Sequence, residues 1–242
     1  MRFLKKVSFA ACVALASISS ANAELMTVKY SDFTVILNCD TKSAVAWSYT
    51  ARHDENNYPR HRTFYTNDMV PSRCQQTSQN TYKSAGDIQY HRGHLVPANA
   101  MDSNKLAIAQ SNDMINVLPQ VAQMNRGAWY QTELWVECRR DEAPVTVFGG
   151  VYKGVTPKGG NFLITHGIKA PEAFWKVALT QNEIIAWWVP NSASATEENI
   201  DNYITSVEAI EEKAGVTISV PNYLKAKKAA ITNANLHGCN NS

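Results

Sequence analysis

The sequence predicts an α+β fold in which helices flank a central antiparallel β-sheet. Five short segments are rich in β-branched and aromatic residues, the composition typical of strands. Two of these segments are separated by a four-residue polar turn, which indicates an antiparallel hairpin. The helical segments are mixed among the strands and do not alternate with them regularly, as they would in a parallel α/β fold.

The strands are expected in chain order at residues 33–37, 44–49, 145–148, 174–179 and 184–189. The last two form the hairpin, and Pro190 ends it because proline cannot donate a hydrogen bond to a strand ladder. A short extended segment at 87–90 is also expected.

Two helices complete the prediction. One runs from about 127 to 138, between the second and third strands, and the other runs from 206 to 214 after the hairpin. Ser206 is placed to cap the second helix, since a serine hydroxyl can accept a hydrogen bond from its first turn. Gly215 follows its last residue and is the natural stop, because glycine readily adopts a left-handed conformation.

The first 23 residues are typical of a secretory signal peptide. A basic start is followed by an apolar run from 7 to 18 and by small residues that end at Ala23. The apolar run is too short to span a bilayer as a helix. We therefore expect residues 24–242 to form a single mature domain that is secreted or periplasmic and has no contact with a membrane.

Cysteine usage agrees with an oxidising destination. Cys12 is expected to leave with the signal peptide, so that Cys39, Cys74, Cys138 and Cys239 remain. An even number of cysteines outside the cytoplasm favours two disulfides. Zinc binding is not favoured, because the spacing contains no Cys-x-x-Cys pair. The sequence leaves the three possible connectivities open.

The charge balance excludes a globally basic protein. The whole chain has a formal charge of +2, and the expected signal peptide holds three of its 23 basic and none of its 21 acidic residues, which leaves −1. Attraction to a polyanion would then have to come from local clusters. The candidates are 60–62, 139–140 and 225–228, and an ordinary solvated surface explains each of them equally well.

Two stretches about thirty residues apart combine a base, a cation and an amide. The first contains Arg92 and His94, and the second contains Asn125. An imidazole can take a proton from water near neutral pH, a guanidinium can neutralise a phosphate, and an amide oxygen can bind a hard divalent cation. These are the parts of a phosphodiester hydrolase. The alternatives are a buried structural role for His94 and helix capping for Asn125.

The spacing between Asn125 and Glu133 limits how both could serve one ion. Eight residues on a continuous helix give roughly 80° of rotation and ~12 Å of rise. Either Asn125 binds the metal and Glu133 orients a water on it, or the backbone bends at Gly127 and brings the two closer.

The order of these motifs resembles the DNA/RNA non-specific endonuclease family, which has a ββα-metal active site. Residues 91–94 read His-Arg-Gly-His, where the family has Asp-Arg-Gly-His. Residues 116–120 supply its Asn and Pro-Gln pair, and residues 125–133 fit its Asn-x-x-x-Trp-x-x-x-Glu helix. The resemblance covers most of the mature chain.

The resemblance implies a role for each matched residue. His94 would be the general base, Arg92 would contact the scissile phosphate, and Asn125 would bind Mg²⁺ directly, with Mn²⁺ as a substitute. Glu133 would hold a water on that metal. Asn116 would support the site through Asn125 or through the His94 loop, although a turn role is an equal alternative. The implied activity is cleavage of DNA and RNA to 5′-phosphate products.

Two positions depart from the family pattern. His91 replaces the usual Asp, which could shift the pH optimum or add a nitrogen ligand, although strand residues three apart point to opposite faces. Glu137 stands where some relatives carry a phosphate-binding Arg. Arg126, Arg139 and Arg140 are the candidate substrate contacts, and Arg139 or Arg140 could compensate for Glu137.

Two other functions remain open at this point. Because His91 replaces the Asp of the family pattern, one alternative is a nuclease-like protein that binds nucleic acid without cutting it. A phosphodiesterase for small nucleotides would also fit, and it would show little activity on polymers. The sequence contains no helix-turn-helix, zinc finger or RNA-binding signature, so base-specific recognition is not expected.

Overall fold

The computed structural model describes residues 23–53, 55, 57–83, 87–153 and 161–233. Residues 1–22 of the expected signal peptide and Cys239 lie outside these ranges. Within them, no helix has the length and apolarity that a membrane crossing requires.

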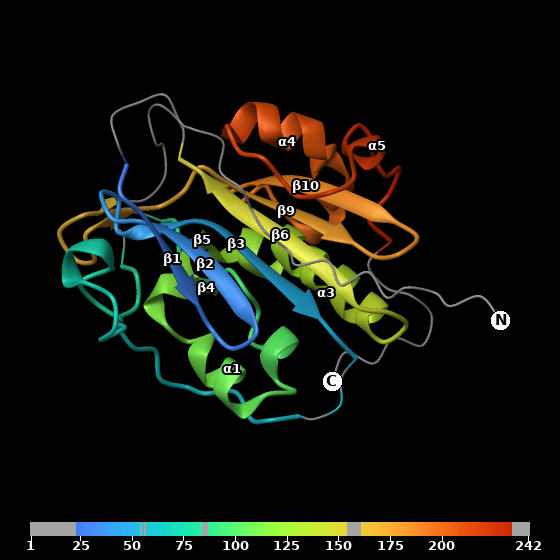
Figure 1. Cartoon of the computed structure of the whole chain (residues 1–242). Helices are drawn as coiled ribbons and strands as arrows, with labels where there is room; N and C mark the ends of the chain where they lie inside the picture. Colours follow the sequence, from blue (N-terminus) through green and yellow to red (C-terminus); the bar gives the residue numbers. More distant parts are fainter. Residues whose placement is uncertain (1–22, 54, 56, 84–86, 154–160, 234–242) are drawn as a thin grey trace.

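A seven-stranded antiparallel sheet forms the centre of the fold (Figure 1). Its strands, in spatial order, are β1 (Leu25–Lys29), β2 (Phe33–Asn38), β3 (Ser43–Ala51), β6 (Val145–Tyr152), β9 (Ala173–Leu179), β10 (Ile184–Pro190) and β11 (Ile204–Thr205). All five expected strands and the hairpin are confirmed. The short edge strands β1 and β11 were not predicted, since neither shows a clear apolar alternation.

Two small sheets and a set of helices complete the fold. The small sheets pair β4 (Tyr90–His94) with β5 (Val117–Val121) and β7 (Asn161–Phe162) with β8 (Ile168–Lys169). The α-helices are α1 (Lys105–Gln110), α2 (Ala122–Arg126), α3 (Ala128–Arg140), α4 (Val207–Ala214) and α5 (Asn222–Lys225). Short 3₁₀ helices lie at η1 (Ser72–Cys74), η2 (Asn99–Met101), η3 (Met114–Asn116) and η4 (Glu197–Tyr203).

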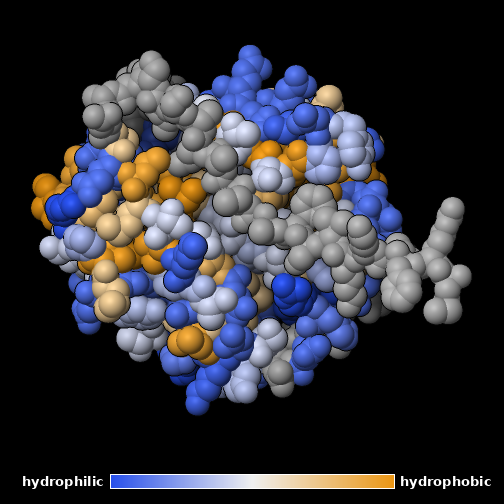
Figure 2. Space-filling model, in the orientation of Figure 1, coloured by the Kyte–Doolittle hydropathy of each residue, from blue (hydrophilic) through white to orange (hydrophobic). Residues whose placement is uncertain are grey.

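Both faces of the large sheet are covered by helices. On β9, Phe174 packs into the core on the α3 side, whereas Trp175 packs into a second cluster that includes Ile210 of α4. Figure 1 shows α4 and α5 on one side of β6, β9 and β10, and Figure 2 shows hydrophilic side chains over the α4 region. Burial on both faces explains why these strands read as continuous apolar runs.

Helix α3 is held against the sheet by a row of residues on adjacent strands. Trp47 on β3 lies opposite Gly149 on β6, and Gly149 lies opposite Lys176 on β9. A Cβ atom at Gly149 would lie 2.2 Å from Cε2 of Trp47, so the indole needs glycine at this position. The freed space lets Trp129 of α3 meet Trp47 edge to face, with ring centroids 6.3 Å apart.

The predicted helix at 127–138 is correct in type but has a break before it. Gly127 has φ −104° and ψ −111°, outside the helical region, and separates α2 from α3. Asn125 lies within α2 and caps neither helix. A bend at Gly127, one of the two alternatives considered from the sequence, is therefore present. The expected second helix is α4, with the Ser206 hydroxyl accepting from Ala209 N and Gly215 in the left-handed conformation.

The expectation of disulfides is confirmed for three of the four cysteines. Cys39 and Cys74 form one bond across 35 residues. Cys138 is also disulfide-bonded. The Cys39–Cys74 bond closes a loop that contains β3 and the segment with Arg60.

We expect the variant Cys39→Ala/Cys74→Ala to lose about 2–4 kcal/mol of unfolding free energy, because a crosslink of this span restricts the unfolded chain. Denaturant unfolding of the double variant, compared with the wild type, measures the loss. Reduced wild-type protein lacks the Cys138 bond as well and should be destabilised at least as much. A loss well below about 1 kcal/mol would show that the crosslink contributes little.

Candidate active site

The motif residues meet where the small β4–β5 sheet is followed by α2 and α3. Residues 90–94 pair antiparallel with 117–121, and α2 begins directly after β5. The chain thus makes the strand, strand, helix order implied by the resemblance. The expected extended segment at 87–90 is displaced, because the strand itself is Tyr90–His94 and His94 is its last residue.

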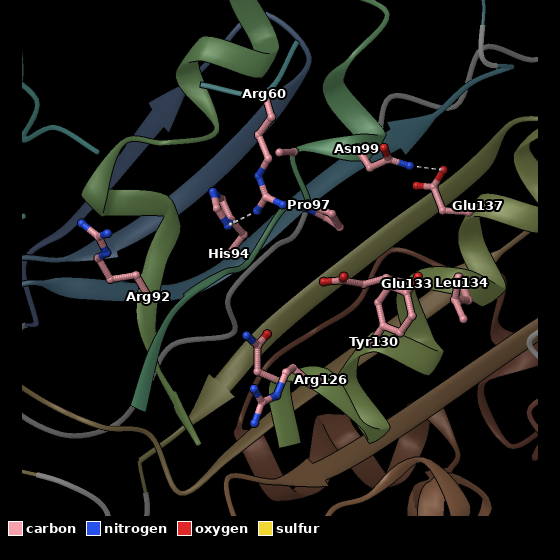
Figure 3. A pocket seen from close by; sticks show the side chains of 12 residues that line it. Arg60, Arg92, His94, Pro97, Asn99, Arg126, Tyr130, Glu133, Leu134 and Glu137 are labelled. Atoms are coloured by element: carbon pink, nitrogen blue, oxygen red, sulfur yellow. Dashed lines mark hydrogen bonds between the residues drawn. The ribbon is translucent and has the colours of Figure 1, made fainter. Parts of the chain in front are cut away.

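A cavity of about 500 Å³ opens between these elements (Figure 3). His94 and Arg60 lie on one side of it, and Tyr130 and Glu133 project from α3 on the other. The cavity is lined by Arg60, Arg92, His94, Pro97, Ala98, Asn99, Asn125, Arg126, Tyr130, Glu133, Leu134 and Glu137. Five of the eight residues proposed from the sequence are among them.

His94 is held between an amide and a guanidinium. Its Nε2 lies 2.9 Å from Oδ1 of Asn112, and the Asn112 Nδ2 donates to the carbonyls of His61 and Thr63, which fixes the orientation of the amide. Because Oδ1 can only accept, Nε2 must carry the proton. The basic lone pair is then on Nδ1, which lies 3.2 Å from Nη2 of Arg60.

The surroundings of His94 keep its ring neutral. Only 8 % of the residue is exposed, and burial is the main cause that lowers its pKa to about 4. The positive charges of Arg60 and Arg92 lower the pKa further, while the bond to Asn112 opposes them. A neutral imidazole, whose lone pair can accept a proton, is the form that a general base requires.

Asn116 supports this arrangement from behind the cavity. It is fully buried; its Oδ1 accepts from Val96 N, and its Nδ2 donates to the carbonyls of Val96 and Ser111. Asn116 does not line the cavity, and its hydrogen bonds hold the turn after His94. Of the two contacts considered from the sequence, it makes the one to the His94 loop.

Asn125 lines the cavity. Its side-chain amide is oriented by His91, the residue that replaces the Asp of the family pattern. The Nδ1 of His91 lies 3.0 Å from Nδ2 of Asn125. Burial, followed by the charge of Arg126, lowers the pKa of His91 and favours a neutral ring that accepts from this amide. The Oδ1 of Asn125 is then available as a ligand atom. His91 and His94 do not converge, as expected for strand residues three apart.

Glu133 supplies a carboxylate to the same cavity from α3. Burial raises its pKa, and the positive charges of Lys176 and then Arg60 oppose this effect. An amide oxygen and a carboxylate facing one cavity are hard donors that suit Mg²⁺ or Mn²⁺. The described residues thus fit the divalent metal that the family pattern implies.

Three arginines line the cavity. Arg92 packs over the ring of Phe64 at 4.1 Å, and its Nη1 donates to the Gln79 carbonyl. Arg126 is exposed at the rim. Arg60 was missed as a site residue, since the sequence showed only a basic cluster at 60–62. Its long loop between β3 and β4 gave no signal that it reaches His94.

The expectation that Arg139 and Arg140 contact substrate is corrected by their positions in the structure. They are only 5 % and 3 % exposed, because the end of α3 is buried. Arg139 pairs with Glu183 and packs on the Trp135 ring at 3.8 Å. Both guanidiniums are therefore engaged inside the protein and do not face the cavity.

Glu137 lines the cavity and forms an ion pair with Arg140. Its Oε2 lies 2.8 Å from Nη2 of Arg140 and accepts from Nδ2 of Asn99. Burial raises the pKa of Glu137 to about 7, although Arg140 lowers it. Arg140 thus compensates for the charge of Glu137, but it does so without replacing the phosphate contact.

Curated relatives are nucleases, and the match spans about half the length of each of them. The chain is 26 % identical over 179 residues to "Nuclease 1, mitochondrial" of Schizosaccharomyces pombe, covering 66 % of this chain and 54 % of the relative. It is 28 % identical over 158 residues to "Endonuclease G, mitochondrial" of Caenorhabditis elegans, covering 58 % and 50 %. The chain thus spans about half the length of these relatives.

A solved structure shares the fold. The crystal structure of the EndoG/EndoGI complex, which describes the mechanism of EndoG inhibition, superposes with a TM-score of 0.68. The match covers 84 % of this chain and 91 % of the other at 18 % identity. This likeness supports the α+β fold with its ββα motif. Residues 16–226 match the DNA/RNA non-specific endonuclease family, and the chain therefore belongs to that family.

Proposed function

We propose that this chain is a metal-dependent, sugar-non-specific endonuclease that hydrolyses DNA and RNA to 5′-phosphate products. The observation that carries the proposal is the neutral His94, whose Nδ1 faces a cavity that also holds arginines and two hard oxygen donors. The family membership supports phosphodiester cleavage in general. The product polarity comes from the family resemblance.

His94 acts as the general base in this proposal. Its Nδ1 takes a proton from a water, the water oxygen bonds to phosphorus, and the bond from phosphorus to the 3′ oxygen breaks. The 3′ oxygen leaves with the bonding electrons and takes up a proton from solvent, so that the phosphate stays on the 5′ side. Arg60 now donates to Nδ1 and must yield that position to the water. Its guanidinium then lies beside the phosphate, where it and Arg92 neutralise developing charge.

Asn125 would bind the divalent cation, which we propose is Mg²⁺ with Mn²⁺ as a substitute, and Glu133 would hold a water on it. When bound, the ion supplies charge stabilisation at the phosphate and the departing oxygen. His91 holds the Nδ2 atom of Asn125, so that Oδ1 would be free to bind the ion. This contact argues against an impaired nuclease, because the histidine still accepts the hydrogen bond that orients the ligand.

The substrate and the cellular setting are further parts of the proposal. The cavity offers Arg60, Arg92 and Arg126 for phosphate, so binding depends on the backbone and tolerates any sequence. Cleavage should weaken as salt rises. We propose that residues 24–242 act as one secreted or periplasmic domain. The character of the first 23 residues and the disulfide between Cys39 and Cys74 support export, although the named relatives are mitochondrial.

The first test is cleavage of supercoiled plasmid by the oxidised mature protein, with Mg²⁺ or with EDTA. His94→Ala should reduce the metal-dependent rate by about 10²–10⁴-fold, because the proton acceptor is lost. The control is His53→Ala, since His53 is an exposed histidine paired with Asp141 and lies outside the cavity. Full activity of His94→Ala, or activity in EDTA, would contradict the proposal.

The second test concerns the protonation of His94. Its pKa is lowered to about 4, so the base form should persist from neutral pH down to about 5, where an ordinary histidine is protonated. NMR titration of the imidazole C–H signals in metal-free protein measures this. Arg60→Gln removes a neighbouring cation and should move the midpoint upward. A wild-type midpoint near 6.5 would contradict the expected burial effect.

The third test concerns metal binding, measured by titration calorimetry with Mg²⁺ and Mn²⁺. His91→Ala removes the acceptor that orients Asn125 and should weaken binding by about 10–100-fold. His91→Asp keeps an acceptor and adds a negative charge, so it should bind the ion more tightly than the wild type. If all three proteins bind equally, His91 has no influence on the ligand amide.

A further inference from the structure

Lys176 is a lysine with no exposed surface, on a strand beneath the active site. It lies on β9 and is among the largest fully buried side chains of the protein. Its Nζ donates to Oγ1 of Thr132 at 2.7 Å and lies 4.1 Å from the centre of the Trp129 ring. Among the described residues it forms no direct ion pair. One neutral hydroxyl and a ring face are modest compensation for a buried ammonium.

The contacts of Lys176 place its ammonium beside the turn of α3 that carries Glu133. Trp129 and Glu133 are four residues apart on α3 and therefore lie on the same side of the helix. Thr132 directly precedes Glu133 and holds the ammonium by its hydroxyl. The Thr132 hydroxyl in turn donates to the carbonyl of Trp129, so its position is fixed.

The charges on the two side chains are complementary. Burial lowers the pKa of Lys176 to about 8, while Glu133 and then Glu137 act to raise it. Lys176 is also the leading positive charge that opposes the effect of burial on Glu133, ahead of Arg60. Each group thus compensates part of the desolvation cost of the other.

We propose that Lys176 is a positioning residue of the active site, whose buried ammonium is the fixed counter-charge of the Glu133 carboxylate. The inference rests on the proposed function, in which Glu133 faces the metal. The charge of Arg60 also acts on Glu133, but Arg60 lies on a loop and, in the proposed function, moves when substrate arrives. Lys176 extends from the middle of β9, between β6 and β10, and stays in place. The sheet thereby stabilises the charged form of Glu133 in both states.

A double-mutant cycle on thermal unfolding tests this pairing. The full mature protein is used in EDTA without nucleic acid, so that the result does not depend on nuclease activity. Lys176→Met removes the charge at similar length and should lower Tm. Glu133→Gln in the wild type leaves the ammonium without its counter-charge and should also lower Tm. In the Lys176→Met background the same change removes an uncompensated carboxylate and should raise Tm.

Lys153 provides the matched control. Its ammonium also donates to a hydroxyl, that of Ser43, and burial lowers its pKa to about 8 without any carboxylate among the causes. Glu133→Gln should therefore change Tm equally in the wild type and in Lys153→Met.

The proposal is overturned if Glu133→Gln changes Tm by the same amount in the wild type and in Lys176→Met. Should Lys176→Met fail to fold, folding of the double variant Lys176→Met/Glu133→Gln supports the pairing, and its failure to fold overturns it. Plasmid cleavage is scored separately. A coupled pair in a protein without nuclease activity would refute the proposed function and leave the pairing intact.

Discussion

The packing of Trp129 against the sheet determines where the active site lies. Trp47, Gly149 and Lys176 form one row across β3, β6 and β9, and the Trp129 ring rests on it. This contact sets the position of α3 and, with it, that of Glu133. Through the break at Gly127 it also determines where α2 presents Asn125. A shift of the helix by an ångström would separate the carboxylate from the amide ligand, and catalysis tolerates little such displacement.

The site combines strong local charge with a nearly neutral protein. Arg60, Arg92 and Arg126 gather at the cavity, whereas Arg139 and Arg140 are used inside the fold. Burial lowers the pKa of His94, and the charges of Arg60 and Arg92 lower it further, so that the ring stays neutral. The same cations are available to a phosphate. The same two guanidiniums thus act on the protonation of His94 and line the cavity that we propose as the phosphate site.

Much of this could be predicted from the sequence, because the informative signals were local. The five strands have apolar runs, and His94, Asn125 and Glu133 stand at fixed spacings. Arg139 and Arg140 were misplaced because a pair of arginines reads the same on a surface and inside an ion-paired core. Arg60 reaches the site through a long loop whose path depends on tertiary contacts. Lys176 was predicted only as part of a strand. Its proximity to Glu133 depends on how α3 packs on the sheet, which the sequence does not show.

His91 and Glu137, the two residues that depart from the family pattern, each form hydrogen bonds with neighbouring side chains. His91 lacks the charge of an aspartate, but a neutral Nδ1 can still accept from Asn125 and leave the ligand oxygen free. Glu137 brings a negative charge in place of a positive one, and Arg140 and Asn99 take up its Oε2. Each substitution therefore changes the charge near the cavity, and each of the new side chains has a hydrogen-bond partner in this chain. In the function that we propose, such changes of charge would adjust metal affinity and the strength of phosphate binding.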